Sequence, residues 1–418
     1  MAEQTGYRVV PVTASQLPEV HRLDDVTWFG EPDPDDLHGD ALDLTRTYAA
    51  TRTGEPPFSG VYSSFDQLLT VPGPGGGLTQ VPCAGLTWVG VHPDERRRGV
   101  LSTMLRHHLD DLHEQRCALG SLHASEVGIY GRFGYGQASF GLELTAGGGA
   151  EVDVPEVDTT GIRTELVATA DEGVAERAHA VQLAVAGRHL GHVTLTEAHN
   201  RARFRDTAMQ QRGGERARAL FAVRDGEDLG YAMFRRTQRW DQSLASGSLR
   251  CWDLTAAEPA ARLALLRRLV GFDLVSSVSL PAGSLDDEVV WWLGGPRAVR
   301  ARVHDALWVR VLDVPAALTQ RGWAADVDVV LEVGDERCPW NAGRWRLVAR
   351  DGAASCEPST TAADVRLPVD ALGSAYLGGR SLAAMATQGL VTELTPGAVS
   401  ALTRAFATER PPSAALMF

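Results

Sequence analysis

The sequence predicts an α+β protein in which three segments follow one another, and three observations support this fold class. A strand, a short loop and an amphipathic helix occur in that order between residues 86 and 112. The same order recurs between residues 249 and 270, and a run of alternating strands followed by helical segments occupies the C-terminal part. We therefore expect domains at residues 1–145, 160–300 and 305–418.

The first segment contains the clearest secondary-structure signals. Residues 7–12 are expected to form a strand and residues 16–25 a helix. Residues 68–71 and 86–91 flank a GPGGG loop, which is typical of a hairpin. Apolar side chains then recur at helical spacing at Val100, Leu101, Met104, Leu105, Leu109 and Leu112. The Gly-rich stretch 145–150 is interpreted as the start of a linker.

The second segment begins with a predicted hairpin at 219–236. Strand 249–254 then leads into helix 260–270, in the order seen in the first segment. We interpret this as an internal repeat of the fold, although coincidence is an alternative because such units are common. In the third segment, strands are expected at 306–314, 326–334 and 343–350, and helices at 371–377, 381–387 and 396–407.

Composition narrows the possible chemistry. Net charge is −13 over 418 residues, which disfavours nucleic-acid partners and favours cationic substrates, unless the charge serves solubility alone. The 40 basic residues are all arginine, so mechanisms that need a P-loop or Schiff-base lysine are excluded. Five scattered cysteines predict buried thiols, with no disulfide frame and no metal site. No long apolar run is present, so we expect a cytoplasmic protein without a membrane partner.

The strongest motif lies between strand 86–91 and the helix that begins near Val100. The loop carries Arg96, Arg97 and Arg98 followed by Gly99. Unpaired N–H groups at a helix start bind pyrophosphate, and glycine allows close approach. The alternative is a solvated basic loop that caps a helix.

A second motif, HASEVGIYGRFGYG at 123–136, places Tyr130 four residues before Gly134 and Tyr135. The two motifs together resemble the GNAT acetyltransferase superfamily, although Leu101 stands where a small residue is common. The runs VHPDERRRGVLSTML and LHASEVGIYGRFGYG resemble most closely the Eis (enhanced intracellular survival) acetyltransferases, which acetylate several amines of aminoglycoside antibiotics.

The resemblance implies tandem GNAT-like domains, the second degenerate, followed by a sterol-carrier-protein-like α+β domain, in a homohexamer. It implies acetyl-CoA as acetyl donor and no metal. Tyr130 would protonate the leaving thiolate, and the alternative for this residue is a core aromatic. The C-terminal carboxylate of Phe418 would act as base, and the alternative is an apolar tail that only packs. The strand and loop expected to bind the donor contribute Trp88, Val89, Val91, Arg96, Arg97, Arg98, Gly99, Val100, Leu101 and Ser102.

The amine pocket and the base are less well defined. Asp25, Trp28, Phe29 and Glu126 are candidate substrate-binding residues, and Asp24, Asp33 and Asp35 add negative charge near them. His123 and Glu126 are alternative bases beside Tyr130. The pair His189 and His192 has no third ligand at metal spacing, so we interpret it as packing or surface residues.

The favoured function is acetylation of primary amines on a cationic small molecule, with aminoglycosides preferred. Two alternatives stay open at this point. The chain acetylates lysine side chains of proteins, or it is a non-catalytic protein whose C-terminal domain binds a lipid. The arginine loop and Tyr130 argue against the non-catalytic lipid-binding protein.

Overall fold

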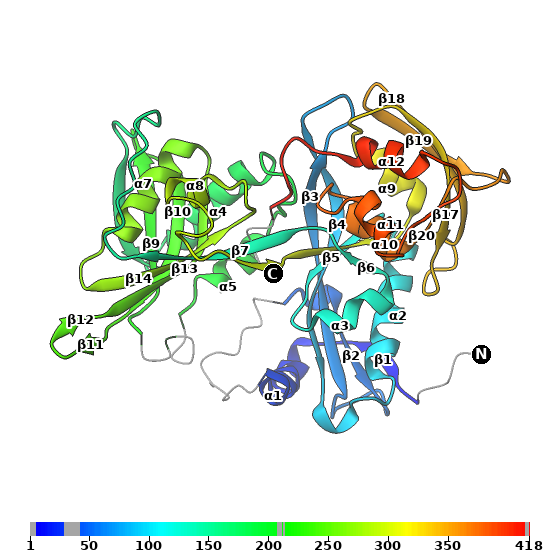
Figure 1. Cartoon of the computed structure of the whole chain (residues 1–418). Helices are drawn as coiled ribbons and strands as arrows, with labels where there is room; N and C mark the ends of the chain where they lie inside the picture. Colours follow the sequence, from blue (N-terminus) through cyan, green and yellow to red (C-terminus); the bar gives the residue numbers. More distant parts are fainter. Residues whose placement is uncertain (1–5, 29–41, 207–210, 212–213, 414–417) are drawn as a thin grey trace. The chain divides into compact units, whose positions relative to one another are not determined.

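The computed structural model describes residues 6–28, 42–206, 211, 214–413 and 418, which form two compact units (Figure 1). The first unit comprises the described residues of 1–138 and 307–408, together with Phe418. The second comprises residues 139–306 and the described part of 409–417. The third predicted segment therefore packs largely with the first.

A seven-stranded sheet forms the centre of the first unit, in the order β1-β2-β3-β4-β5-β16-β6. The hairpin predicted across the GPGGG loop is confirmed, and its strands pair antiparallel from Gly60↔Val91 to Pro72↔Leu78. The strands are β1 (Arg8–Pro11), β2 (Thr47–Thr51), β3 (Gly60–Pro72), β4 (Leu78–Val91), β5 (Leu119–His123), β6 (Tyr135–Gln137) and β16 (Leu307–Val311).

Two principal helices accompany this sheet. The predicted amphipathic helix is confirmed as α2 (Val100–Glu114), and its apolar face is buried apart from Leu101, which is half-buried. Helix α1 (Leu17–Trp28) extends beyond the predicted 16–25. The short elements are η1 (Ala14–Gln16), η4 (Leu44–Arg46), η5 (Pro93–Glu95), α3 (Val127–Tyr130) and η6 (Gly131–Phe133).

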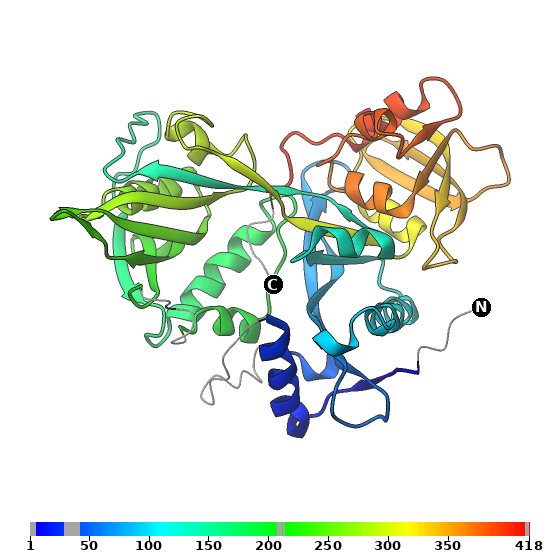
Figure 2. The same ribbon diagram turned by 60° about the horizontal axis from the view of Figure 1, so that its bottom comes forward.

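The C-terminal part of the first unit has a sheet of its own, in the order β19-β18-β17-β20-β21, with helices drawn in yellow, orange and red beside it (Figure 2). The strand expected at 306–314 does not join this sheet. As β16 it pairs antiparallel with β5 and β6. This pairing connects the C-terminal segment to the first sheet, and both belong to one unit. The remaining elements are α9 (Val314–Gln320), β17 (Val327–Gly334), β18 (Gly343–Arg350), β19 (Ala353–Pro358), β20 (Val365–Pro368), α10 (Val369–Ala375), α11 (Leu382–Thr387), β21 (Thr392–Glu393) and α12 (Ala398–Phe406).

The second unit repeats the strand–helix–strand order of the first. Its sheet runs β15-β7-β14-β13-β10-β9-β8, and β13 is parallel to β14 just as β4 is parallel to β5. Thr145 to Gly147 complete β7, so the stretch interpreted as a linker begins as a strand. The elements are β7 (Phe140–Gly147), β8 (Arg163–Ala168), α4 (Val174–Ala186), α5 (Glu197–Arg203), β9 (Arg218–Arg224), β10 (Glu227–Thr237), β11 (Trp240–Asp241), β12 (Leu244–Ala245), β13 (Gly247–Ala256), α7 (Pro259–Val270), β14 (Val275–Ala282), α8 (Glu288–Trp292) and β15 (Arg302–Asp305).

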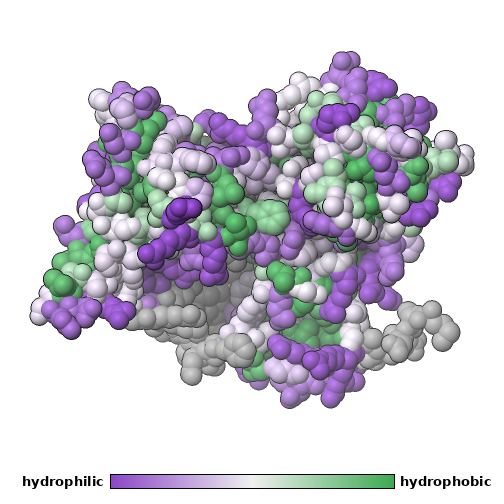
Figure 3. All heavy atoms as spheres, viewed as in Figure 1, coloured by the Kyte–Doolittle hydropathy of each residue, from purple (hydrophilic) through white to green (hydrophobic). Residues whose placement is uncertain are grey.

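Hydrophilic residues predominate on the molecular face drawn in Figure 3, between scattered apolar ones. Within the described residues, no helix is both long and apolar enough to cross a bilayer. None of the five cysteines forms a disulfide. Four are buried, as predicted, while Cys117 is half-buried.

Candidate functional site

Strands β4 and β5 diverge in the middle of the first sheet. They pair in parallel at Ala84↔Gly120 and Gly85↔Ser121, and β4 then continues to Val91. The β3–β4 register shifts between Val61↔Gly90 and Ser63↔Thr87, so β4 carries a bulge there. Trp88, inside the bulge, has the unusual φ of 52°. Beyond Gly85, the edge of β4 that faces β5 therefore offers backbone groups to an extended ligand.

The arginine loop connects this strand to α2. Gly99 is the N-cap of α2 with φ 87°, a conformation that favours glycine. The first hydrogen bond of the helix runs from the Thr103 N–H to the Gly99 carbonyl at 2.9 Å, so the amides of residues 100–102 precede it. Arg96 and Arg97 are exposed. The 15-residue helix thus begins with N–H groups that its own hydrogen bonds do not use, directly after a loop that carries exposed arginines.

Glu95 holds this loop against the sheet, a contact that spacing along the sequence does not reveal. It accepts a hydrogen bond from the Tyr7 hydroxyl and pairs with Arg52 Nη2 at 3.0 Å. The hydrogen bond from Tyr7 and the pairing with Arg52 lower the pKa of Glu95. Arg98 is a weaker partner at 3.5 Å. The loop is therefore held by the residue just before β1 and the residue just after β2.

Tyr130 ends helix α3 and is only 6% exposed. It packs in one apolar cluster with Leu86 of β4 and Leu122 of β5, which lie just beyond the point of divergence. Burial, and secondarily Glu126, raises the pKa of Tyr130 to about 12. The hydroxyl is therefore protonated at neutral pH. Glu126, the N-cap of α3, is itself exposed.

Phe418 belongs to the first unit and lies where β4 and β5 diverge. Its ring lies 5.1 Å from the His123 ring, edge to face. A Cβ built on Gly85 would stand 2.8 Å from the Phe418 ring and equally close to the Gln67 amide, so glycine is required for this contact. Gln67 in turn donates to Ser121 at 2.7 Å. The terminal residue is thus placed beside the last paired residues of β4 and β5.

Helix α1, which carries the candidate amine-binding residues Asp25 and Trp28, packs against β4. Thr27 approaches the position of a Gly90 Cβ to 3.4 Å, and His21 meets Trp88 at 6.4 Å between ring centroids. Trp28 is 49% exposed. Burial, and then the charge of Asp25, raises the pKa of Asp24 to about 6.

The structure brings some of the predicted residues together and leaves others aside. Residues 88–102 form one continuous edge and loop, and Tyr130 and Phe418 lie near the paired ends of β4 and β5. Asp25 and Trp28 lie on α1, the helix that contacts β4. Phe29, Asp33 and Asp35 lie outside the described residues.

The equivalent loop of the second unit lacks the features of an anion site. Helix α7 begins at Pro259, which has no N–H, after the N-cap Glu258. Glu258 pairs with Arg224 at 2.7 Å. Arg262 is engaged by Asp287 at 2.8 Å. An acidic residue and a proline therefore stand at the start of this helix.

The histidine pair of the second unit packs together. His189 and His192 stack with ring centroids 4.9 Å apart, and burial lowers the pKa of His192 to about 3. Ser413 lies over them, donating its N–H to the Leu190 carbonyl at 2.8 Å. Among the described residues, no group of three acidic, histidine or cysteine side chains is arranged to hold a metal ion.

Comparison with known proteins agrees with this geometry. Residues 8–138 and 196–311 each match the model of a GNAT acetyltransferase domain, and residues 314–414 match that of a sterol carrier protein domain. The internal repeat predicted from the sequence is therefore confirmed as two GNAT domains, followed by a sterol-carrier-like domain.

Relatives cover most of the chain. An uncharacterized N-acetyltransferase of Streptomyces coelicolor is 38% identical over 84% of both chains. The N-acetyltransferase Eis of Mycobacterium tuberculosis is 32% identical over 88% of both chains. The crystal structure of Eis1 from Mycobacterium abscessus matches with a TM-score of 0.82 and 28% identity, over 99% of this chain and 100% of that one. The chain therefore belongs to the Eis family of GNAT N-acetyltransferases.

Proposed function

We propose that this N-acetyltransferase transfers acetyl from acetyl-CoA to primary amines of a cationic small molecule, with aminoglycosides preferred, at one or several positions. The observation that carries the proposal is the continuous surface from the bulged edge of β4 to Gly99 at the N-cap of α2. It combines unpaired backbone groups with arginines, which suits the extended arm and the diphosphate of acetyl-CoA.

The donor would be held along residues 88–102. The backbone of Trp88, Val89 and Val91 would pair with the pantetheine arm, and the amides of residues 99–102 would hold the pyrophosphate with help from Arg96 to Arg98. The second unit is assigned no donor site, because Glu258 and Pro259 stand at the corresponding helix start.

Tyr130 and Phe418 would move the protons of the reaction. The amine nitrogen attacks the thioester carbonyl, the carbon–sulfur bond breaks, and the departing thiolate takes a proton from the Tyr130 hydroxyl. A phenol with a pKa of about 12 gives up its proton only as the thiolate forms in a dry pocket. The amine proton passes to the carboxylate of Phe418, directly or through a water.

A thiol-release assay with acetyl-CoA tests the function. We expect release with an aminoglycoside acceptor and little with a lysine-containing peptide or without acceptor. Release with the peptide alone would instead support the protein lysine acetyltransferase. No release with any amine, together with no acetyl-CoA binding, would leave the non-catalytic lipid-binding function.

A change at the chain end tests the base in the same assay. Appending a few glycines to Phe418 leaves the ring intact but displaces the α-carboxylate, so turnover should collapse while acetyl-CoA still binds. Normal turnover of the extended chain would assign the base to Glu126 or His123.

A further inference from the structure

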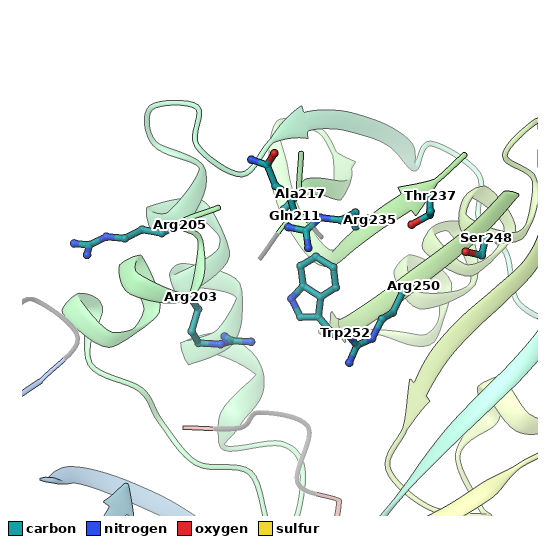
Figure 4. Close-up of a pocket in the computed structure, with 9 residues that line it drawn as sticks. All are labelled: Arg203, Arg205, Gln211, Ala217, Arg235, Thr237, Ser248, Arg250 and Trp252. Carbon is teal, nitrogen blue, oxygen red and sulfur yellow. The ribbon is translucent and has the colours of Figure 1, made fainter. Parts of the chain in front are cut away.

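A pocket of about 440 Å³ opens on one face of the second unit's sheet (Figure 4). Strands β10 and β13 supply its floor, where Arg235 pairs directly with Arg250 and Thr237 with Ser248. Trp252 follows on the same strand face. This face carries α4, whereas α7 packs on a different apolar cluster, so the pocket is not the counterpart of the donor loop.

Positive charge is in excess around this pocket. Like charges directly opposite on neighbouring strands are destabilising, yet Arg235 faces Arg250 there. Arg235 pairs with Asp206, whereas no ion-pair partner of Arg250 is found among the residues that the structure describes. In a chain of net charge −13, three arginines converging on one pocket indicate an anionic ligand.

Arg203 provides an independent indication. Its Nη2 binds Asp253 at 2.8 Å, and the side chain is only 15% exposed. Its Nη1 is buried without a hydrogen-bond partner in the described part of the chain. A buried donor without an acceptor is costly. Figure 4 shows the guanidinium groups of Arg203, Arg235 and Arg250 around the indole of Trp252, whereas Arg205 points away. An anion at this place would satisfy the free donor.

The indole defines the second part of the ligand. Trp252 is half-buried in the pocket wall, and the Arg235 guanidinium lies 5.6 Å from its ring centroid. The wall is therefore flat, apolar and flanked by cations. We propose that the second unit binds a small planar aromatic molecule that carries a phosphate or carboxylate group, with the anion on Arg203 and Arg250 and the ring against Trp252.

Calorimetry on the full chain tests the site, with saturating CoA present to occupy the donor site. We expect phenyl phosphate or benzoate to bind and phenol not to bind. Whichever of the two anions binds more tightly identifies the anionic group of the ligand. Arg250→Ala should weaken that binding at least tenfold with acetyl transfer unchanged. Trp252→Leu should weaken the binding of phenyl phosphate but leave the binding of inorganic phosphate unchanged.

Arg297→Ala is the matched control, since Arg297 is an exposed arginine of the same unit outside the pocket lining. It should leave both binding and turnover unchanged. Two results would overturn the proposal. One is that neither acid binds, and the other is that Arg250→Ala binds them as tightly as the unaltered chain does.

Discussion

Tyr130 is buried, and we propose that its hydroxyl acts as the general acid. The sequence motif locates this residue, but its place in one apolar cluster with Leu86 and Leu122 emerges only when β4, β5 and α3 come together. The same applies to Glu95, whose partners Tyr7 and Arg52 lie 88 and 43 residues away along the chain. Side-chain partners at such separations have no local signal in one sequence.

Tyr130→Phe should lower kcat by about 10²- to 10⁴-fold, the usual range for a general acid. Acetyl-CoA affinity should change little, because the hydroxyl acts only as the thiolate departs. Steady-state kinetics and calorimetry measure the two quantities. Wild-type turnover, with chemistry shown to limit the rate, would make Tyr130 a core aromatic only.

Gly85→Ala should displace Phe418, because the new methyl group would stand 2.8 Å from its ring. We expect kcat to fall at least tenfold while the melting temperature changes by only a few degrees, since a chain end yields easily. Gln67→Met is the control: it loses the hydrogen bond to Ser121 but leaves room for the ring, so it should remain active. Equal losses in both variants would contradict the account.

The elements were largely predictable, and their partners were not. The spacing of Val100, Met104 and Leu109 predicts α2 because helix periodicity is local. Residues 307–311 read as a strand, but nothing in them indicates that they pair with β5 and β6 instead of the C-terminal sheet. Likewise, the glycines at 147–149 hide the fact that β7 ends among them.

Helix α1 holds a carboxyl group that is costly to ionise. The pKa of Asp24 is raised to about 6, so its charged form is disfavoured in the folded chain. Asp24→Asn should therefore stabilise the protein by about 3 kcal/mol at pH 7.5. The gain should develop between about pH 4 and pH 6 and be absent below pH 4, where the carboxyl is protonated in both states.

Melting temperatures at pH 7.5 and pH 4 measure this effect. Glu126→Gln, on an exposed carboxylate, should show no such gain. Because Asp24 would gain from a nearby cation, its variant should also raise KM for a cationic amine. A loss of stability at pH 7.5 would contradict the burial argument.

At the scale of the whole molecule, three buried histidines make the fold sensitive to acid. Burial lowers the pKa of His108 and His192 to about 3 and that of His199 to about 4. In the unfolded chain each takes up a proton near pH 6.5, so this contribution to stability is present above pH 6.5 and declines below it.

Well below pH 6.5, the three histidines together should reduce the stability of the unaltered chain by about 4 kcal/mol for each pH unit of acidification. This loss outweighs the stability that the chain gains when Asp24 is protonated. Melting curves at pH 7.5 and 5.5 should therefore differ strongly. His199→Gln should reduce the difference. An unchanged melting temperature would mean that these rings reach solvent or an acidic partner.

The proposed acetyl transfer needs a donor site at the start of α2, and calorimetric titration with acetyl-CoA tests for that site directly. Gly99→Asp places a carboxylate where the pyrophosphate should lie, whereas Gly173→Asp makes the same change at the N-cap of α4, where φ is 80° and the backbone strain is comparable. We predict that Gly173→Asp binds acetyl-CoA like the unaltered chain and that Gly99→Asp, still folded, does not bind it. Undiminished binding by Gly99→Asp would contradict the account.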